Sequence, residues 1–72
     1  MLRIEKMLKE LGFEVINDGD FLSAKCSIKN WYVTIRKIRS KYTIETVVDK
    51  IKALKTLKNE CEARNYIAQV VV

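Results

Sequence analysis

The feature that most constrains the fold of this chain is an alternation of side-chain character between residues 21 and 35. Apolar residues occupy every second position from 22 to 28, and the pattern resumes after the short connection Lys29-Asn30. Successive side chains of a β-strand point to opposite faces, so the alternation predicts two strands that each bury one face. The tight connection predicts an antiparallel hairpin. The residues predicted to face the core are Leu22, Ala24, Cys26 and Ile28 in the first strand, and Trp31, Val33 and Ile35 in the second.

The residues before this hairpin predict a helix followed by a short strand. Apolar side chains at positions 4, 7, 8 and 11 have the spacing of one helix face, and Gly12 suits the left-handed residue that ends many helices. We therefore expect a helix over residues 2–11. Residues 13–16 are rich in aromatic and β-branched side chains and predict a strand, and the Asp-Gly pair at 18–19 predicts the turn that follows it.

The residues after the hairpin predict a basic loop, a long helix and a last strand. Residues 37–41 are basic and are expected to leave the sheet. Apolar residues recur at helical spacing from Ile44 to Cys61, with Thr43 as the N-cap, so we expect a helix over 44–63. The apolar run 66–72 predicts a strand covered on both faces, as in parallel pairing. The expected fold is a single α/β domain over residues 1–72, of order αβββαβ, with a four-stranded mixed sheet flanked by two helices.

The composition of these 72 residues fits one small globular domain. Apolar residues make up 49%, and there are two glycines and no proline. Two cysteines without histidine exclude a sulfur–imidazole zinc site, so we expect no metal and no cofactor. No apolar run approaches the roughly 20 residues that span a bilayer, and the N-terminus has no signal-peptide core. We expect a cytoplasmic protein without a membrane partner, and a homodimer because so short a chain buries little surface.

The net charge of +5 is unevenly distributed along the chain. Residues 1–24 carry a net charge of −2, residues 25–58 a net charge of +8 and residues 59–72 a net charge of −1. A middle section this basic indicates an acidic partner, of which nucleic acid is the first candidate.

Five segments of the chain match the sequence pattern of a known protein family that has this predicted order of helices and strands. They are LKELGFEV at 8–15, the Asp-Gly-Asp turn at 18–20, YVTIRKIRSK at 32–41, IETVVDKIKALKTL at 44–57 and IAQVVV at 67–72. In these segments, over nearly its whole length, the chain resembles the PD-(D/E)xK nuclease superfamily, in particular its Mrr-type restriction endonucleases. The resemblance implies a restriction endonuclease-like core and, in active members, a magnesium-dependent deoxyribonuclease.

The resemblance also implies positions for a catalytic site. The family holds a divalent cation with an aspartate at the start of the second strand and an acidic residue on the third, two positions before a lysine. Here the third-strand pair becomes Thr34 and Arg36, the second-strand aspartate aligns with Phe21 or with Asp20, and Glu5 matches an acidic position in the first helix. Arginine stays protonated and cannot exchange a proton near neutral pH, which predicts a catalytically degenerate nuclease core.

Basic residues near aromatic ones are the candidates for nucleic-acid binding. Tyr32 and Tyr42 are candidates for stacking on bases, whereas Trp31 shares the parity of core positions. Lys25 is expected beside Arg36 on the neighbouring strand, where an anion would relieve the repulsion between them. The predicted nucleic-acid-binding residues are Lys25, Lys29, Arg36, Lys37, Arg39, Lys41 and Lys50.

Three functions remain open from the sequence. The first is a non-enzymatic domain that binds nucleic acid, with duplex DNA as the expected partner. The second is a metal-dependent DNA endonuclease whose active-site residues have migrated, using Glu5, Asp18 or Asp20, and Lys25, with magnesium as its cofactor. The third is a structural or oligomerisation module whose basic charge serves solubility.

Overall fold

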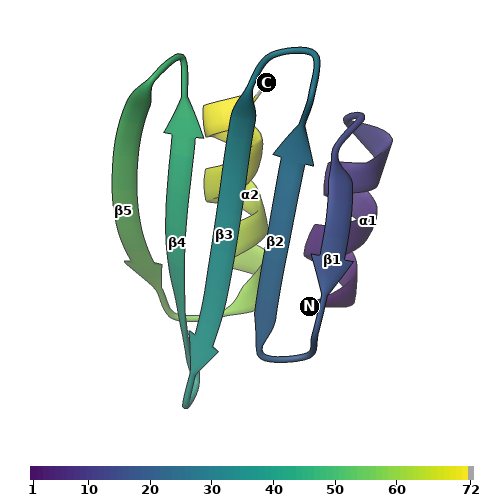
Figure 1. The fold of residues 1–72 in the computed structure, drawn as a ribbon. Helices are drawn as coiled ribbons and strands as arrows, with labels where there is room; N and C mark the ends of the chain where they lie inside the picture. The colour runs from purple at the N-terminus through teal and green to yellow at the C-terminus, as the bar shows by residue number, and fades with distance from the viewer. Residues whose placement is uncertain (72) are drawn as a thin grey trace.

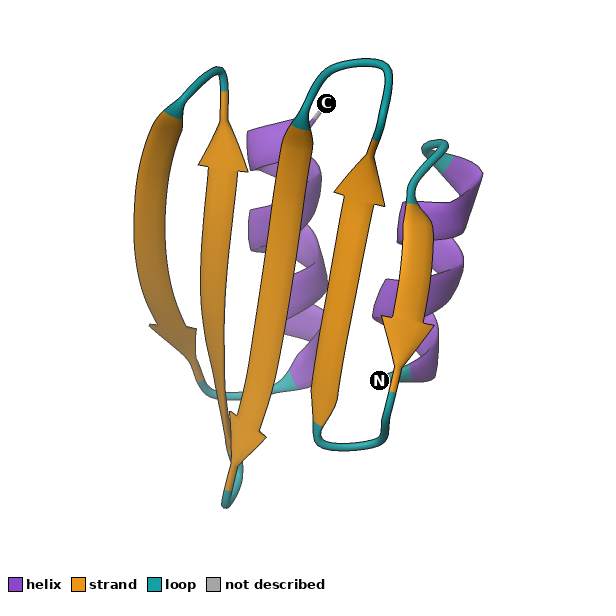
Figure 2. Cartoon of the chain, in the orientation of Figure 1, coloured by secondary structure: helices purple, strands orange, loops and turns teal. Residues whose placement is uncertain are grey.

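The computed structural model describes residues 1–71, which form five strands between an N-terminal and a C-terminal helix along the chain (Figures 1 and 2). Helix α1 comes first, the strands follow in one uninterrupted series, and helix α2 ends the described chain. The elements are α1 (Leu2–Glu10), β1 (Glu14–Asn17), β2 (Phe21–Cys26), β3 (Trp31–Ile38), β4 (Lys41–Val48), β5 (Ile51–Leu57) and α2 (Glu60–Val71).

The strands form a single antiparallel meander in the order β1-β2-β3-β4-β5. Each strand pairs with the next one along the chain, so every connection within the sheet is a hairpin. The tightest connections are Arg39-Ser40 between β3 and β4, and Asp49-Lys50 between β4 and β5. Both residues of the second turn have positive φ, 52° and 69°, the pattern of a type I′ turn.

Both helices cover the same face of the sheet, and the core lies between these two layers (Figure 1). Helix α1 contacts β1 and α2, while α2 also contacts β4 and β5. The helices contribute their buried side chains to the side of the sheet that holds the buried residues of β2, β3 and β4. The side chains fully removed from solvent are Ile4, Leu8, Leu22, Val33, Ile35, Ile44, Ala63 and Ile67, with Thr46 as a buried polar neighbour at 1% exposure.

Helix α2 begins with a side-chain cap on Asn59. The Asn59 Oδ1 accepts a hydrogen bond from the backbone N–H of Glu62 at 2.9 Å, and the Glu62 carboxylate accepts one from the backbone N–H of Lys58 at 3.4 Å. The first bond satisfies an N–H group that the first turn of a helix leaves without a helical partner, and the second ties the preceding residue to that turn. Glu60 and Glu62 add negative charge at the positive end of the helix dipole.

The first half of the chain folds as its sequence predicts. The helix expected over 2–11 is observed as α1, the strand expected over 13–16 as β1, and the alternating hairpin as β2 and β3. Leu22, Ala24, Cys26, Val33 and Ile35 are buried on the face predicted for them. Ile28 is not part of β2 and is 91% exposed, because the strand ends at Cys26.

The second half of the chain does not fold as its sequence predicts. The predicted helix over 44–63 is wrong, since residues 41–57 form β4 and β5, and the predicted strand over 66–72 is wrong over its described residues, which belong to α2. The expected basic loop at 37–41 is the end of β3, a two-residue turn and the start of β4. The sheet therefore has five antiparallel strands, not four mixed strands, and the observed order is αβββββα, not αβββαβ.

The physical reason for this error is that residues 41–57 satisfy two periodicities. Apolar residues recur at helical spacing, but Tyr42 and Ile44 also alternate with the polar Lys41, Thr43 and Glu45, and the segment is rich in β-branched residues. The turn between the two strands is Asp49-Lys50, which lacks the glycine that marks most type I′ turns. Without that signal the two strands look like one continuous helix.

Candidate functional site

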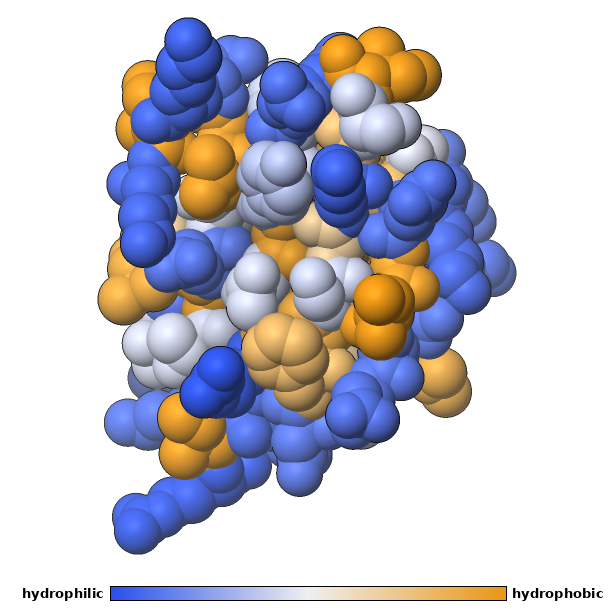
Figure 3. Space-filling view, in the orientation of Figure 1, coloured by the Kyte–Doolittle hydropathy of each residue, from blue (hydrophilic) through white to orange (hydrophobic). Residues whose placement is uncertain are grey.

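The face of the sheet opposite the helices, here called the open face, carries side chains that no other element covers. The strand register and the burial of each residue together assign side chains to this face. Figure 3 views the molecule from the open face, with hydrophobic (orange) and intermediate (pale) side chains near its middle and hydrophilic (blue) ones around them. From β1 to β5 these side chains are Glu14, Ile16, Phe21, Ser23, Lys25, Tyr32, Thr34, Arg36, Ile38, Lys41, Thr43, Glu45, Val47, Lys52, Leu54 and Thr56.

Two cation–aromatic pairs lie on β2 and β3 of the open face. Phe21 lies directly across from Arg36, whose guanidinium carbon is 5.5 Å from the centre of the phenyl ring. Lys25 lies across from Tyr32, with its ammonium nitrogen 5.8 Å from the ring centre. Both distances are within the range of a cation–π attraction. Phe21 and Lys25 are four positions apart on β2, which is about 13 Å at the rise of an extended strand.

The net charge of the protein resides entirely in the sheet layer. Helices α1 and α2 carry four basic and four acidic residues, so their net charge is zero. The strands and their connections carry ten basic and five acidic residues, which accounts for the whole excess of +5. An anionic partner is therefore attracted toward the sheet, not toward the helices.

A hollow of about 300 Å³ lies in the open face over β3, β4 and β5. Thr34 and Thr43 are half-buried in its lining, and Arg36 and Glu45 supply opposite charges to it. Glu45 pairs with Lys52 across the sheet at 3.4 Å, so its carboxylate is anchored on one side. The hollow is lined by Thr34, Arg36, Ile38, Thr43, Glu45 and Leu54.

The structure separates the predicted nucleic-acid-binding residues into two groups. Lys25, Arg36 and Lys41 share the open face. The remaining residues lie at the ends of the sheet or on its other side. Lys29 and Lys50 lie in the turns at one end, Arg39 lies in the β3–β4 turn at the other end, and Lys37 lies against the Tyr42 ring on the helix side.

Two expectations about individual residues are corrected by the register and by burial. Lys25 does not lie beside Arg36, since it pairs with Tyr32 while Phe21 occupies the place across from Arg36. Tyr42, a predicted stacking residue, is buried on the helix side at 8% exposure. Tyr32 is 42% exposed on the open face, where a stacking residue needs to be. Trp31 is on the core side as predicted, and its Nε1–H donates to the Asp49 carboxylate at 3.1 Å.

The candidate catalytic residues do not converge on one site. Thr34 and Arg36 lie on the open face, whereas Glu5 lies in the helix layer on the opposite side of the sheet. Asp20 lies in the β1–β2 turn, where its carbonyl accepts a hydrogen bond from the backbone N–H of Lys37 at 2.8 Å. Glu5 and Lys25, which the migrated nuclease site would combine, are likewise on opposite faces.

Glu5 is part of a local network that joins α1 to β1. Its carboxylate binds the Lys9 ammonium at 2.8 Å and accepts a hydrogen bond from the Asn17 amide at 3.0 Å. The Lys9 contact, followed by the Asn17 contact, lowers the pKa of Glu5 below its ordinary value of 4.5, so the carboxylate is ionised at neutral pH. Glu5 thus fixes the end of β1 against the helix.

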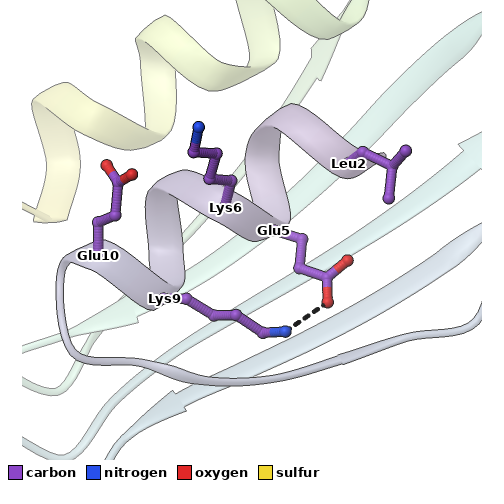
Figure 4. A pocket seen from close by; sticks show the side chains of 5 residues that line it. All are labelled: Leu2, Glu5, Lys6, Lys9 and Glu10. Carbon is purple, nitrogen blue, oxygen red and sulfur yellow. Dashed lines mark ion pairs between the residues drawn. The ribbon is translucent and has the colours of Figure 1, made fainter.

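A second hollow lies along the exposed side of α1, as Figure 4 shows, with Leu2 at one end and Glu10 at the other. In it the Glu5 and Lys9 side chains point toward one another and form an ion pair. Since these charges already satisfy each other, this hollow offers a ligand less than the open face does. Cys26 is buried, as the alternation of its strand predicts, and Cys61 is exposed on α2.

No group of three or more histidine, cysteine, aspartate or glutamate side chains within residues 1–71 is arranged to hold a metal ion. Neither α1 nor the described part of α2 has the length and apolar character needed to cross a membrane.

Sequence reasoning missed three residues of the open face that shape the candidate site. Phe21 was aligned only with a catalytic aspartate, and Glu45 and Lys52 were placed on a helix. A signal was present for Phe21, because its parity in β2 opposes the buried Leu22. For Glu45 and Lys52 the signal was the alternation of residues 41–48, which was masked by the helical spacing.

Comparison of the chain with known protein families, with curated proteins and with solved structures gives no significant match. The resemblance to the PD-(D/E)xK nucleases therefore stays a prediction from the sequence. The order of elements on which it depends differs from the order observed.

Proposed function

We propose that this protein binds single-stranded nucleic acid on the open face of its sheet, without catalysing a reaction on it. The observation that carries the proposal is the pair of cation–aromatic contacts, Phe21 with Arg36 and Tyr32 with Lys25, on the uncovered side of a basic sheet. Aromatic rings stack on bases of any sequence, and adjacent cations contact the phosphates that link them.

The open face suits a single strand better than the duplex DNA expected from the sequence. In a duplex the faces of the bases are stacked on one another and are not available to a protein ring, whereas single-stranded bases can spread over aromatic side chains. Duplex recognition places a helix or a ribbon in a groove, and the two helices of this protein together carry no net positive charge. The two cation–aromatic pairs are about 13 Å apart along the strands, which leaves room for successive bases.

The phosphate contacts would come from four basic side chains of the open face. Lys25 and Arg36 lie beside the rings, and Lys41 lies near the β3–β4 turn. Lys52 lies on β5 across from Val47 of β4, which in turn lies across from Tyr32. Each contact releases counterions from the nucleic acid, so the affinity falls as the salt concentration rises. Three to four contacts predict a slope of log K against log salt of about −2 to −3 for a single strand.

Fluorescence anisotropy with labelled octauridylate and octathymidylate, between about 50 and 200 mM salt, tests this proposal. We expect binding with the stated slope and weaker binding to a duplex of the same length. Replacing Tyr32 by Ala should weaken binding about tenfold, because one stacked base contributes about 1–3 kcal/mol.

A pair of matched charge variants makes the test specific to the open face. Lys25→Gln removes a charge from this face, whereas Lys55→Gln removes one from the helix side of β5. The first should make the slope less negative by about 0.7, and the second should leave it unchanged. Equal effects of the two changes, or full affinity in Tyr32→Ala, would contradict the proposal.

The proposal extends to the assembly and the compartment expected from the sequence. Strand β5 is an edge of the sheet, and its seven residues have a row of backbone groups available to another strand. A second copy paired through β5 would double the area of the open face. A homodimer would therefore bind a longer single strand of nucleic acid than one copy does. Single-stranded RNA and DNA are present in the cytoplasm, the compartment that the sequence predicts.

A further inference from the structure

We infer that the hollow over β3, β4 and β5 is a pocket for one nucleobase and that it prefers guanine. This inference rests on the proposed function and adds the base specificity of the same face. Its basis is a guanidinium and a carboxylate that lie on one face within reach of one hollow and yet are not paired with each other.

The register explains why Arg36 and Glu45 flank the hollow. Glu45 lies across from Thr34, and Arg36 lies across from Thr43, so the two charged residues are diagonal neighbours on β3 and β4. Diagonal neighbours on antiparallel strands are about 7–8 Å apart, close enough for long side chains of opposite charge to meet.

Each charged group is instead held by a partner on its far side. The Arg36 guanidinium lies over the Phe21 ring on β2, and the Glu45 carboxylate binds the Lys52 ammonium on β5 at 3.4 Å. Within residues 1–71, Arg36 has no carboxylate within 4 Å. The hollow is the space between these two groups. On one side of it are the N–H donors of Arg36 and on the other the acceptor oxygens of Glu45, and the two groups are not bonded to each other.

A base that fits this arrangement needs two acceptors beside two donors. Guanine has them, since O6 and N7 accept hydrogen bonds and the N1–H and the N2 amine donate them. Arginine donates to O6 and N7 in the commonest specific contact to this base, and a carboxylate can accept from N1 and N2. Adenine has an amine in place of O6, and uracil has no edge with two adjacent donors.

The remaining lining of the hollow suits a flat ring. Ile38 and Leu54 are exposed apolar side chains, 55% and 68% exposed, and can contact the ring face or edge. The hydroxyls of Thr34 and Thr43 can donate or accept hydrogen bonds without regard to the base. The volume of about 300 Å³ is at the lower end of ligand pockets and is large enough for one base.

The test compares octauridylates that carry one central substitution, by fluorescence anisotropy at fixed salt. Wild-type protein should bind the guanine-containing oligonucleotide about tenfold more tightly than the uridine-only, adenine-containing or cytosine-containing ones. Replacing the guanine by 7-deazaguanine, which lacks N7, or by hypoxanthine, which lacks the N2 amine, should each remove part of the preference.

Two variants separate base selection from general binding. Arg36→Lys keeps the charge but loses the fork of donors, so its affinity for the guanine-containing octauridylate should fall more than its affinity for plain octauridylate, and the tenfold ratio between the two should shrink. Glu45→Gln removes the carboxylate and should also lose the preference. The matched control is Glu14→Gln on the same face outside the hollow, which should keep the preference.

The outcomes distinguish this inference from the proposed function. If wild-type protein binds all the octauridylates equally, the guanine pocket is wrong and the proposed function stands. If Arg36→Lys and Glu45→Gln keep a tenfold preference, guanine is selected elsewhere and the inference is again wrong. If none of the oligonucleotides binds, both the function and the pocket are wrong.

Discussion

Single residues in the hairpin turns of this protein adopt a backbone conformation that usually belongs to glycine. Arg39 has φ of 59° in the β3–β4 turn, and Lys50 has φ of 69° in the β4–β5 turn. A left-handed conformation brings Cβ close to the following carbonyl oxygen, at a cost of about 1–2 kcal/mol for an ordinary residue. The protein thus holds two long basic side chains at positions where glycine would fit with less strain.

The strain predicts that Lys50→Gly stabilises the fold. It would create an Asp-Gly pair, the residues that a type I′ turn favours, although the added freedom of the unfolded chain offsets part of the gain. We expect the free energy of unfolding to rise by about 0.5–1 kcal/mol in urea denaturation. Lys50→Ala is the control, because it removes the same side chain but keeps Cβ and should give no such gain. A glycine variant no more stable than the alanine variant would contradict this view of the turn.

Among the elements, helix α2 depends most visibly on a single residue at its start. The Asn59 side chain accepts the Glu62 N–H at 2.9 Å, and the residues that follow place Ala63, Ile67 and Val71 in the core. We expect Asn59→Ala to destabilise the protein by about 1 kcal/mol, because an N–H of the first turn loses its acceptor. Asn59→Asp, which keeps an acceptor at the cap, should restore most of the loss. Thermal denaturation followed by circular dichroism measures both, and an unaffected alanine variant would show that the cap contributes little.

The elements also show where the sequence is informative and where it is not. The alternating segments 21–26 and 31–35 have one periodicity, and the faces predicted from it are those observed. Residues 41–57 have two periodicities, and the turn that would decide between them is formed by Asp49 and Lys50 without glycine. The Asn59…Glu62 pair was the available sign that a helix begins only after residue 58, since such a spacing is typical of a capping box.

Only part of the candidate site could be predicted from the sequence, because residues 41–57 have two periodicities. Lys25, Tyr32 and Arg36 lie on the two strands that could be predicted, and their parity assigns them to the open face. Glu45 and Lys52 reach that face through β4 and β5, which the helical spacing concealed. Which residues meet across strands depends on the register, and the register depends on turns that have no clear sequence signal.

For the whole molecule, the exposed edge of β5 predicts how two copies associate. A two-fold axis at Leu54, the middle residue of the strand, would pair Leu54 with itself and Ile51 with Leu57 of the second copy. The same register places Lys52 opposite Thr56 and Lys55 opposite Ala53, so the lysines of the two strands do not face one another. Ile51 is 72% exposed in the single chain and would become covered.

We therefore expect a dimer in sedimentation equilibrium at tens of micromolar. The change Ile51→Lys should shift it to monomer, because it places a charge at the end of the new strand pair. Lys58→Glu, a charge change outside the paired residues, is the control and should leave the dimer intact. A wild-type protein that sediments as a monomer at these concentrations would contradict the edge-pairing model.

The meander has a consequence for how quickly the chain folds. Each strand pairs only with its neighbour in sequence, so the sheet can assemble from successive hairpins, each closing a short loop at low entropic cost. The helices come from opposite ends of the chain, and Arg3 and Glu60 meet through a backbone N–H and a carboxylate oxygen at 3.1 Å. That contact closes a loop of nearly the whole chain. We therefore expect the docking of α1 against α2 to be the slowest structural step, after the β2–β3–β4 hairpins have formed.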